Sequence, residues 1–167
     1  MRLRGGMSLN GGFMTAFEPS NVLGGAVGIG GTIGLAARLG IQFNHLLGLY
    51  YQASPQLGFY TVGTTGLVSA SLFNSVLASL TFGDFFEVAA GPSIDVVGLF
   101  GCSLAAMECA QNGGMGLGAH ARLGIFVSGR SGIRRTGFNI GVDLHPIFLF
   151  GGVILFTATA GIGVEWY

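Results

Sequence analysis

The stretch FTATAGIGVEWY, Phe156–Tyr167, separates into two kinds of residue when every second position is taken together. The first set is apolar and consists of Phe156, Ala158, Ala160, Ile162, Val164 and Trp166. The second set is small or polar and consists of Thr157, Thr159, Gly161, Gly163, Glu165 and Tyr167. A period of two is that of a β-strand, whose successive side chains point to opposite faces. The stretch therefore predicts a strand with one apolar and one polar face.

The same alternation runs through VGIGGTIGLAARLGIQF, Val27–Phe43, where Arg38 falls on the polar face. It continues in the segments 86–96, 117–127 and 138–144. A membrane helix is the rival reading, because Ile147–Val164 is an uncharged run just long enough to cross a bilayer. A helix has no reason to keep a period of two over such lengths, so the pattern favours strands.

The composition indicates a membrane protein of one domain, residues 1–167. Half of the residues are hydrophobic, only 8% are charged, and the mean hydropathy is +0.68. The 32 glycines argue against efficient helices. A formal net charge of zero gives no electrostatic reason to expect a nucleic acid as partner. In a bilayer, strands satisfy their backbone groups only by closing into a barrel.

We therefore predict an all-β protein, an eight-stranded antiparallel transmembrane β-barrel. The expected strands are 3–17, 26–43, 46–62, 67–82, 85–98, 115–127, 135–144 and 153–166. An even number of strands puts both termini on one side, which we expect to be the periplasmic side. Tight turns are expected there at 44–45, 83–84 and 128–134, and outer loops at 18–25, 63–66, 99–114 and 145–152.

With this alternation, glycine content and aromatic C-terminus, the chain resembles the small eight-stranded bacterial outer-membrane barrels, the OmpA/OmpX/OmpW-like group. The resemblance implies a place in a Gram-negative outer membrane, with membrane lipid around a monomer. It also implies insertion by the barrel assembly machinery, which reads an outward aromatic at the C-terminus, here Trp166. The start of the chain has no apolar signal-peptide core, so we expect that a leader has been removed.

Inward-facing charges gather near the periplasmic end of the predicted barrel. Opposite charges at one level of a low-dielectric lumen can neutralise each other, which predicts a salt-bridged layer that closes the lumen; an ion pathway is the alternative. The layer consists of Arg4, Arg38, Glu87, Arg122 and Glu165. Small residues above it could leave room for water or a small ligand, beside the upper-lumen residues Tyr50, Gln52, Asp95, His120 and Asp143.

No motif for catalysis, cofactor or metal emerges. The glycines of GAVGIGGTIG lack the acidic residue that a dinucleotide fingerprint needs about twenty positions further on. The lipid A deacylases among such barrels use a His and a Ser two positions apart, and no histidine of this chain has that spacing. A Ser93–His120–Asp95 arrangement is geometrically possible, although an interior hydrogen-bond network accounts for the same residues. We expect no enzyme activity and no cofactor.

The two cysteines, Cys102 and Cys109, fall in the longest expected outer loop. No other residues beside them complete a zinc site, so we predict no metal. A disulfide formed in an oxidising compartment is the better interpretation.

The expected function is that of an integral outer-membrane barrel with a structural, adhesive or minor uptake role. A narrow channel or conduit for small or apolar solutes is the second interpretation, and a lipid-modifying enzyme is the third.

Overall fold

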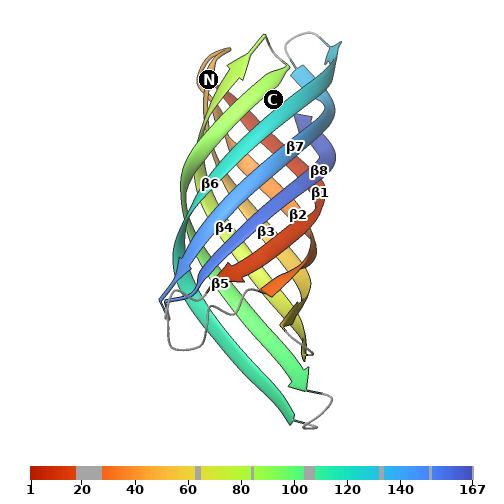
Figure 1. Cartoon of the computed structure of the whole chain (residues 1–167). Coiled ribbons are helices and arrows are strands. Elements are labelled where there is room, and N and C mark those ends of the chain that lie inside the picture. The colour runs from red at the N-terminus through yellow and green to blue at the C-terminus, as the bar shows by residue number, and fades with distance from the viewer. Residues whose placement is uncertain are drawn as a thin grey trace.

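The computed structural model describes residues 1–17, 28–62, 65–83, 85–103, 108–131, 134–150 and 152–166. They form eight strands that close into one barrel (Figure 1). The strands are β1 (Arg2–Phe17), β2 (Gly28–Gln42), β3 (Leu47–Val62), β4 (Thr65–Phe82), β5 (Phe86–Ser103), β6 (Glu108–Ser131), β7 (Arg134–Leu149) and β8 (Ile154–Trp166). Within the described ranges, no helix has the length and apolar character needed to cross a membrane.

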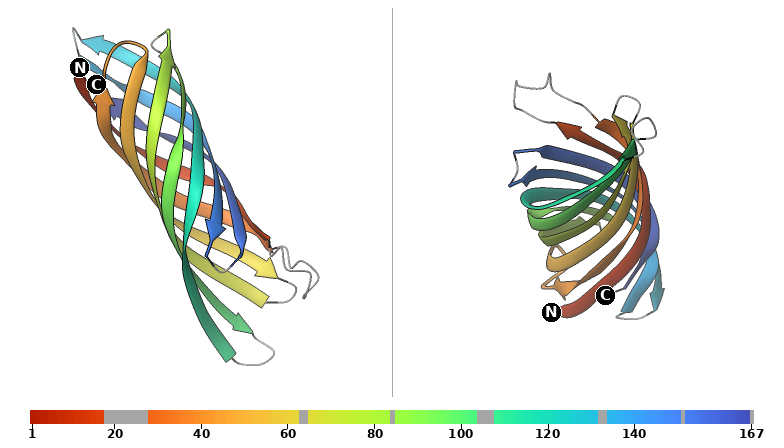
Figure 2. Two further views of the ribbon diagram at one scale, coloured as in Figure 1. Left: turned by 90° about the vertical axis from the view of Figure 1, so that its left-hand side faces the viewer. Right: turned by 90° about the horizontal axis from the view of Figure 1, so that it is seen from below.

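Each strand pairs antiparallel with its neighbours in the sequence, and β1 pairs with β8 to close the barrel. That last ladder runs without interruption from Gly5 opposite Trp166 to Phe17 opposite Ile154. Both chain termini lie at one end, called the terminus end below, and the opposite end is called the loop end (Figures 1 and 2). The predicted fold class is confirmed.

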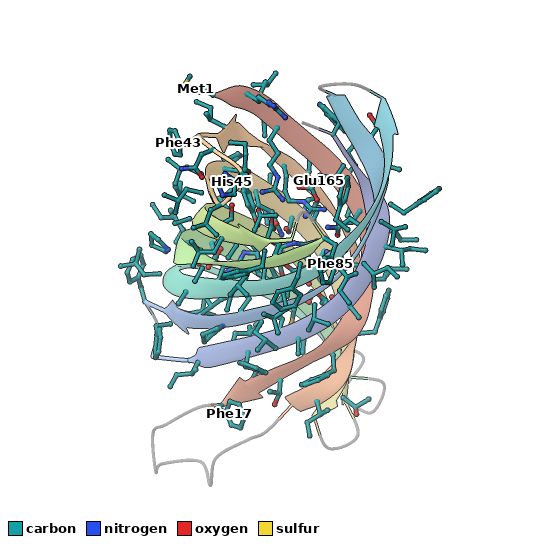
Figure 3. All side chains as sticks on the ribbon, turned by 90° about the horizontal axis from the view of Figure 1, so that it is seen from above. Met1, Phe17, Phe43, His45, Phe85 and Glu165 are labelled. Atoms are coloured by element: carbon teal, nitrogen blue, oxygen red, sulfur yellow. The ribbon has the colours of Figure 1, made fainter. Side chains whose placement is uncertain are left out.

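The predicted alternation of faces holds along the strands. On β8, Glu165 is 1% exposed and points into the barrel, whereas Ile162 is 66% exposed on the outer wall. Large apolar side chains cover the outside, and Figure 3 shows them radiating from the wall while Glu165 lies within it. This inversion, with an apolar outside and a polar inside, is what a barrel needs when its solvent is lipid.

Two of the predicted loops are wrong, because the strands run further than the sequence suggested. The segment 99–114 was expected to be an outer loop, but β5 continues to Ser103 and β6 begins at Glu108. The two strands form a hairpin that projects past the others at the loop end (Figures 1 and 2). The segment 145–152 was expected to be a second loop, but β7 continues to Leu149. Likewise, most of the predicted turn at 128–134 belongs to β6, which ends at Ser131.

Three prolines lie within the strands of the barrel, and one of them, Pro146, is in the part of β7 that was expected to be a loop. Pro55, Pro92 and Pro146 all lie inside strands, with side chains on the outer wall. Beside each proline, one of its strand's two ladders is interrupted. At Pro55 the β2–β3 ladder breaks between the pairs Gly34–Gln56 and Ala37–Ala53. At Pro92 the β4–β5 ladder breaks between Ser75–Ser93 and Ala78–Ala90, and at Pro146 the β6–β7 ladder breaks between Gly118–Ile147 and Ala121–Leu144. Proline has no N–H to donate, so each strand tolerates it by giving up bonds to one neighbour.

Asn74 is a polar residue on the outer wall, and its contacts explain how lipid-facing strand β4 accommodates it. The Tyr51 hydroxyl donates to Asn74 Oδ1 at 2.5 Å, and Asn74 Nδ2 lies 3.3 Å from the backbone oxygen of Ile94. The free-energy cost of placing an amide in lipid is much lower when the amide is hydrogen-bonded to its neighbours than when it is not.

The disulfide between Cys102 and Cys109 stays a prediction, because their side chains lie outside the described part of the structure. The loop that was expected to carry them is a hairpin, in which Cys102 on β5 stands directly opposite Cys109 on β6. Directly opposite residues of an antiparallel pair have Cα atoms about 4.5–5.5 Å apart, within the range that a disulfide spans.

We expect protein from an oxidising compartment to contain this bond. Alkylation without reductant should leave the intact mass unchanged, and alkylation after reduction should add two labels. Two labels in the unreduced sample would contradict the prediction.

Candidate functional site in the barrel interior

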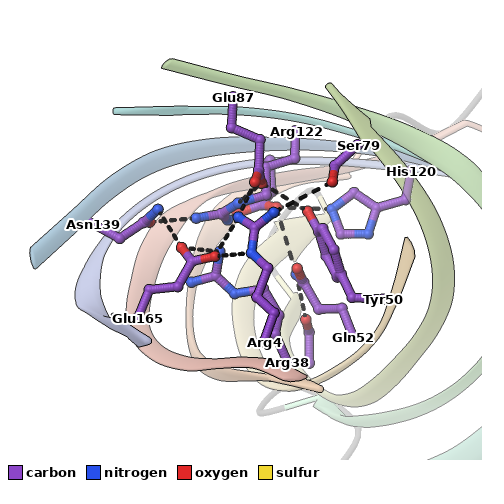
Figure 4. A network of polar contacts seen from close by, with 12 residues as sticks. Arg4, Arg38, Tyr50, Gln52, Ser79, Glu87, His120, Arg122, Asn139 and Glu165 are labelled. Atoms are coloured by element: carbon purple, nitrogen blue, oxygen red, sulfur yellow. Dashed lines mark hydrogen bonds and ion pairs between the residues drawn. The ribbon is translucent and has the colours of Figure 1, made fainter. Parts of the chain in front are cut away.

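Near the terminus end, ion pairs join side chains from opposite walls of the barrel (Figure 4). Arg4, on β1, pairs with both Glu87 on β5 and Glu165 on β8. Arg38 Nη1 lies 3.6 Å from Glu165 Oε2, and Arg122 Nε lies 3.9 Å from Glu87 Oε1. All five side chains are buried. The structure therefore brings together the five residues that the sequence predicted for a charged layer.

Neutral side chains complete this layer. The Tyr50 hydroxyl donates to Glu87 Oε1 at 3.0 Å, and the Arg4 guanidinium lies 5.3 Å from the centroid of the Tyr50 ring. Asn139 Nδ2 donates to Glu165 Oε2 at 2.9 Å, while its Oδ1 accepts from Arg122 Nη2 at 2.5 Å. Tyr50, which the sequence placed in the upper lumen, thus contacts the charged layer itself. Asn139 was not selected from the sequence, although its inward position in the alternation was visible.

Above the charged layer, Asp143 connects Arg122 to His120. Arg122 Nη1 donates to Asp143 Oδ2 at 2.7 Å, and His120 Nε2 lies 2.8 Å from Asp143 Oδ1. The other ring nitrogen of His120 lies 2.9 Å from Ser75 Oγ. Gln52 Nε2 reaches the same Asp143 oxygen at 3.5 Å. Four of the five upper-lumen residues therefore belong to one connected network that includes the charged layer.

The fifth, Asp95, has Ser93 and His145 as its partners. The Ser93 hydroxyl donates to Asp95 Oδ2 at 2.6 Å, and His145 Nε2 lies 3.1 Å from that oxygen and 2.8 Å from Ser93 Oγ. Ser93 and Asp95 therefore do meet, but the histidine beside them is His145, which β7 brings inward, and not the His120 of the arrangement considered from the sequence. The His120 and His145 rings stack with centroids 4.8 Å apart.

Towards the loop end, apolar side chains fill the interior. The His145 ring lies 4.7 Å from the centroid of Phe73, which packs into a fully buried apolar cluster. The cluster consists of Met14, Phe73, Val97, Ile147 and Leu155, with Leu99 and Leu149 packed against it. The sequence had suggested an upper lumen of small residues with room for water or a ligand. Ile147, Leu99 and Leu149 lie in segments that had been assigned to loops, whereas the other four lie in predicted strands and were overlooked.

Some buried polar atoms of the interior have no hydrogen-bond partner in the described structure. They include all three guanidinium nitrogens of Arg38, both amide atoms of Asn10, and the hydroxyls of Ser71 and Thr81. Among the described residues, no group of three or more His, Cys, Asp or Glu side chains could hold a metal ion.

The chain of Ser75, His120 and Asp143 has the order of a nucleophile, a base and an orienting acid. Its geometry alone does not make a site for acyl transfer. Ser75 is 1% exposed, and Arg122 already neutralises Asp143. The arrangement instead satisfies the hydrogen bonds of buried polar groups inside the closed barrel.

An apolar outer wall around a paired polar interior, in a closed barrel of eight antiparallel strands, defines an integral membrane β-barrel of the outer-membrane type. Its localisation in the outer membrane follows from this architecture.

Solved structures share this fold. One is Ail, the attachment invasion locus protein of Yersinia pestis, in complex with the heparin analogue sucrose octasulfate; it has a TM-score of 0.66 and 11% identity, over 99% of either chain. Another is Neisserial surface protein A, with a TM-score of 0.58 and 15% identity, over 96% of either chain. No protein-family model and no curated protein sequence matches the chain. At sequence identities this low, the similarity to these structures extends to the fold alone.

Proposed function

We propose that this protein is a closed outer-membrane barrel that acts through its projecting β5–β6 hairpin as an attachment surface. In this proposal the terminus end faces the periplasm and the hairpin faces the outside of the cell. The barrel anchors the hairpin as a monomer, catalyses no reaction and conducts no solute through its lumen.

A closed lumen is supported by the two groups of side chains that fill it. Buried ion pairs cross it near the terminus end, and the apolar cluster around Phe73 fills it towards the loop end. An eight-stranded barrel has an interior just wide enough for side chains to fill. An ion entering this interior would have to displace paired charges and then cross an apolar layer, which opposes the channel interpretation.

The projecting hairpin supports attachment over a purely structural role. Most strands end near the barrel rim, whereas β5 and β6 continue as a paired ribbon beyond it (Figure 1). Two-stranded ribbons of this kind present side chains on both faces to a partner. The fold neighbour Ail is described as an attachment invasion locus protein, which agrees with such a role without identifying the partner.

The partner's chemistry should differ from the sulfated sugar bound by that neighbour. The segments at the loop end, 18–25, 63–66, 99–114 and 145–152, contain no lysine and no arginine. Recognition of sulfate groups relies on such cations. We therefore expect this protein to bind a protein surface rather than heparin or another sulfated glycan.

Shortening the hairpin tests the proposal. Deletion of residues 100–111 leaves Leu99 and Asn112 as a two-residue turn between Gly98 and Gly113, which are already paired. Cells that express this variant should lose adherence to those immobilised proteins, out of a screened panel, that hold wild-type cells, while a heat-dependent gel shift shows that the barrel still folds.

Two comparisons sharpen the result. A Cys102→Ser/Cys109→Ser variant keeps the hairpin length and separates the loss of the ribbon from the loss of the cysteines. Immobilised heparin should retain neither the wild type nor the variant. Unchanged adherence after the deletion, with normal display on the cell surface, would contradict the proposal.

A further inference from the structure

The arginines that do not belong to the charged layer gather at the terminus end of the barrel. The chain has no lysine, and its basic side chains other than histidine are seven arginines. Three of the seven form part of the charged layer. The other four are Arg2 at the start of β1 and Arg130, Arg134 and Arg135 in the hairpin that joins β6 to β7. This hairpin lies at the terminus end, beside both chain termini (Figure 2).

The two ends of the barrel therefore differ in charge. The loop-end segments 18–25, 63–66, 99–114 and 145–152 contain two glutamates and no lysine or arginine. At the terminus end, the connecting segments 44–45, 83–84 and 128–135 contain three arginines and a single acidic residue, Asp84. A net positive charge is thus confined to the terminus end, and most of it lies in one hairpin.

The register of the β6–β7 hairpin places its arginines close together. Arg130 stands directly opposite Arg135, and Arg134 follows opposite Ser131. Like charges directly opposite each other destabilise an antiparallel pair, so this hairpin gains from an anion beside it. The carboxylate opposite Gly137 on β8 is Glu165, which already pairs with Arg4 and Arg38.

The hairpin also lies at the right depth to meet lipid headgroups. Val127 and Phe138, paired across β6 and β7, are 62% and 72% exposed on the apolar outer wall. Arg130 and Arg135 lie three residues further toward the turn, which is about 10 Å along a strand. With strands tilted by about 40°, this corresponds to about 7 Å along the membrane normal. The headgroup region occupies about 5–7 Å on each side of the hydrocarbon core, so these arginines stand at the level of the lipid phosphates.

We propose that the β6–β7 hairpin binds the phosphate groups of anionic phospholipids, of the phosphatidylglycerol class, in the membrane leaflet at the terminus end. Guanidinium groups bind phosphate through paired hydrogen bonds, and a lipid of net negative charge offsets the opposed arginines where a zwitterionic lipid does not. The proposal takes only the orientation of the barrel from the proposed function, because a periplasmic terminus end faces the phospholipid leaflet. It does not depend on attachment through the β5–β6 hairpin.

Quenching of tryptophan fluorescence tests the lipid site on the whole protein in bilayers of mixed lipids. Trp166 is the only tryptophan of the chain, is 40% exposed, and stands opposite Thr136, the residue after Arg135. The probes are phosphatidylglycerol and phosphatidylcholine with brominated acyl chains, since bromine quenches a nearby tryptophan. Brominated phosphatidylglycerol should compete for the place beside Trp166 about tenfold better than brominated phosphatidylcholine, and 1 M salt, by screening, should weaken this preference.

Three variants assign the preference to the hairpin, and a heat-dependent gel shift checks that each one folds. Replacing Arg130, Arg134 and Arg135 together by glutamine should remove the preference, whereas replacing all three by lysine should keep most of it because the charge remains. The matched control Arg2→Gln removes a cation at the same end from β1 and should also keep most of it.

An equal affinity of the wild type for the two brominated lipids would overturn the proposal. So would an Arg2→Gln variant that loses as much preference as the triple glutamine variant, because the whole end and not the hairpin would then attract the lipid. Lipid A presents phosphate groups from the other leaflet of an outer membrane. If added lipid A relieved the quenching and unbrominated phosphatidylglycerol did not, the site would belong to lipid A and the assignment to phospholipid would be wrong.

Discussion

Glu87→Ala lowers the free energy of unfolding by about 3–5 kcal/mol, because it leaves a buried arginine short of a partner. Glu87 pairs with Arg4 and accepts the Tyr50 hydroxyl, and it lies near Arg122. Its loss leaves Arg4 and Arg38 to share Glu165 and deprives Tyr50 of its acceptor. Reversible urea unfolding in liposomes, followed by tryptophan fluorescence of Trp166, measures the change.

Two variants separate this effect from simple truncation. Thr81 stands opposite Glu87 on β4, and its hydroxyl has no hydrogen-bond partner, so Thr81→Ala should cost no more than about 1 kcal/mol. The double variant Arg4→Leu/Glu87→Leu removes both charges and should be less destabilised than the sum of the two single changes. An additive double variant would show that the two side chains are not coupled.

Phe73→Ala also lowers the free energy of unfolding by about 3–5 kcal/mol, through a different mechanism. The ring is fully buried within the barrel, where it contacts the His145 ring and the apolar cluster. Its removal costs the transfer free energy of the side chain and leaves a cavity that the closed wall cannot collapse. The same unfolding experiment measures it.

The control for this variant is Phe138→Ala, which truncates a phenylalanine that is 72% exposed on the outer wall. Lipid fills the space there, so only the transfer term of about 1.5–3 kcal/mol should be lost. Equal losses for the two variants would mean that Phe73 is not packed in a closed interior.

The fold could be predicted from the sequence because the decisive signal is repeated. A period of two places Arg38 and Glu165 inside and Ile162 outside, and the same alternation recurs in at least five segments of the chain. The charged layer followed from strand direction, because inward charges near the same end of adjacent strands must lie at one level. These inferences need only the pleat of a strand and the closure of the sheet.

The strand ends were harder to predict, and the errors in the site follow from them. The strand at 135–144 was expected to stop before Pro146, but β7 continues through this proline, which a barrel accepts where one ladder is interrupted. Stopping β7 at Leu144 hid His145, which is the partner of Asp95, and also Ile147 in the apolar cluster. Sequence alternation also cannot tell which inward residues meet across the lumen, because the stagger of the barrel decides this.

The central claim is that the lumen is closed by the charged layer and the apolar cluster, and single-channel recording in planar bilayers tests it most directly. The wild type should show no steady conductance, whereas a variant that removes the layer and opens the cluster, Arg4→Ser/Glu87→Ser/Phe73→Ala, should show ion leakage if it still inserts and folds. A wild type that conducts steadily through its lumen would contradict the account, because the same charges would then line a pathway.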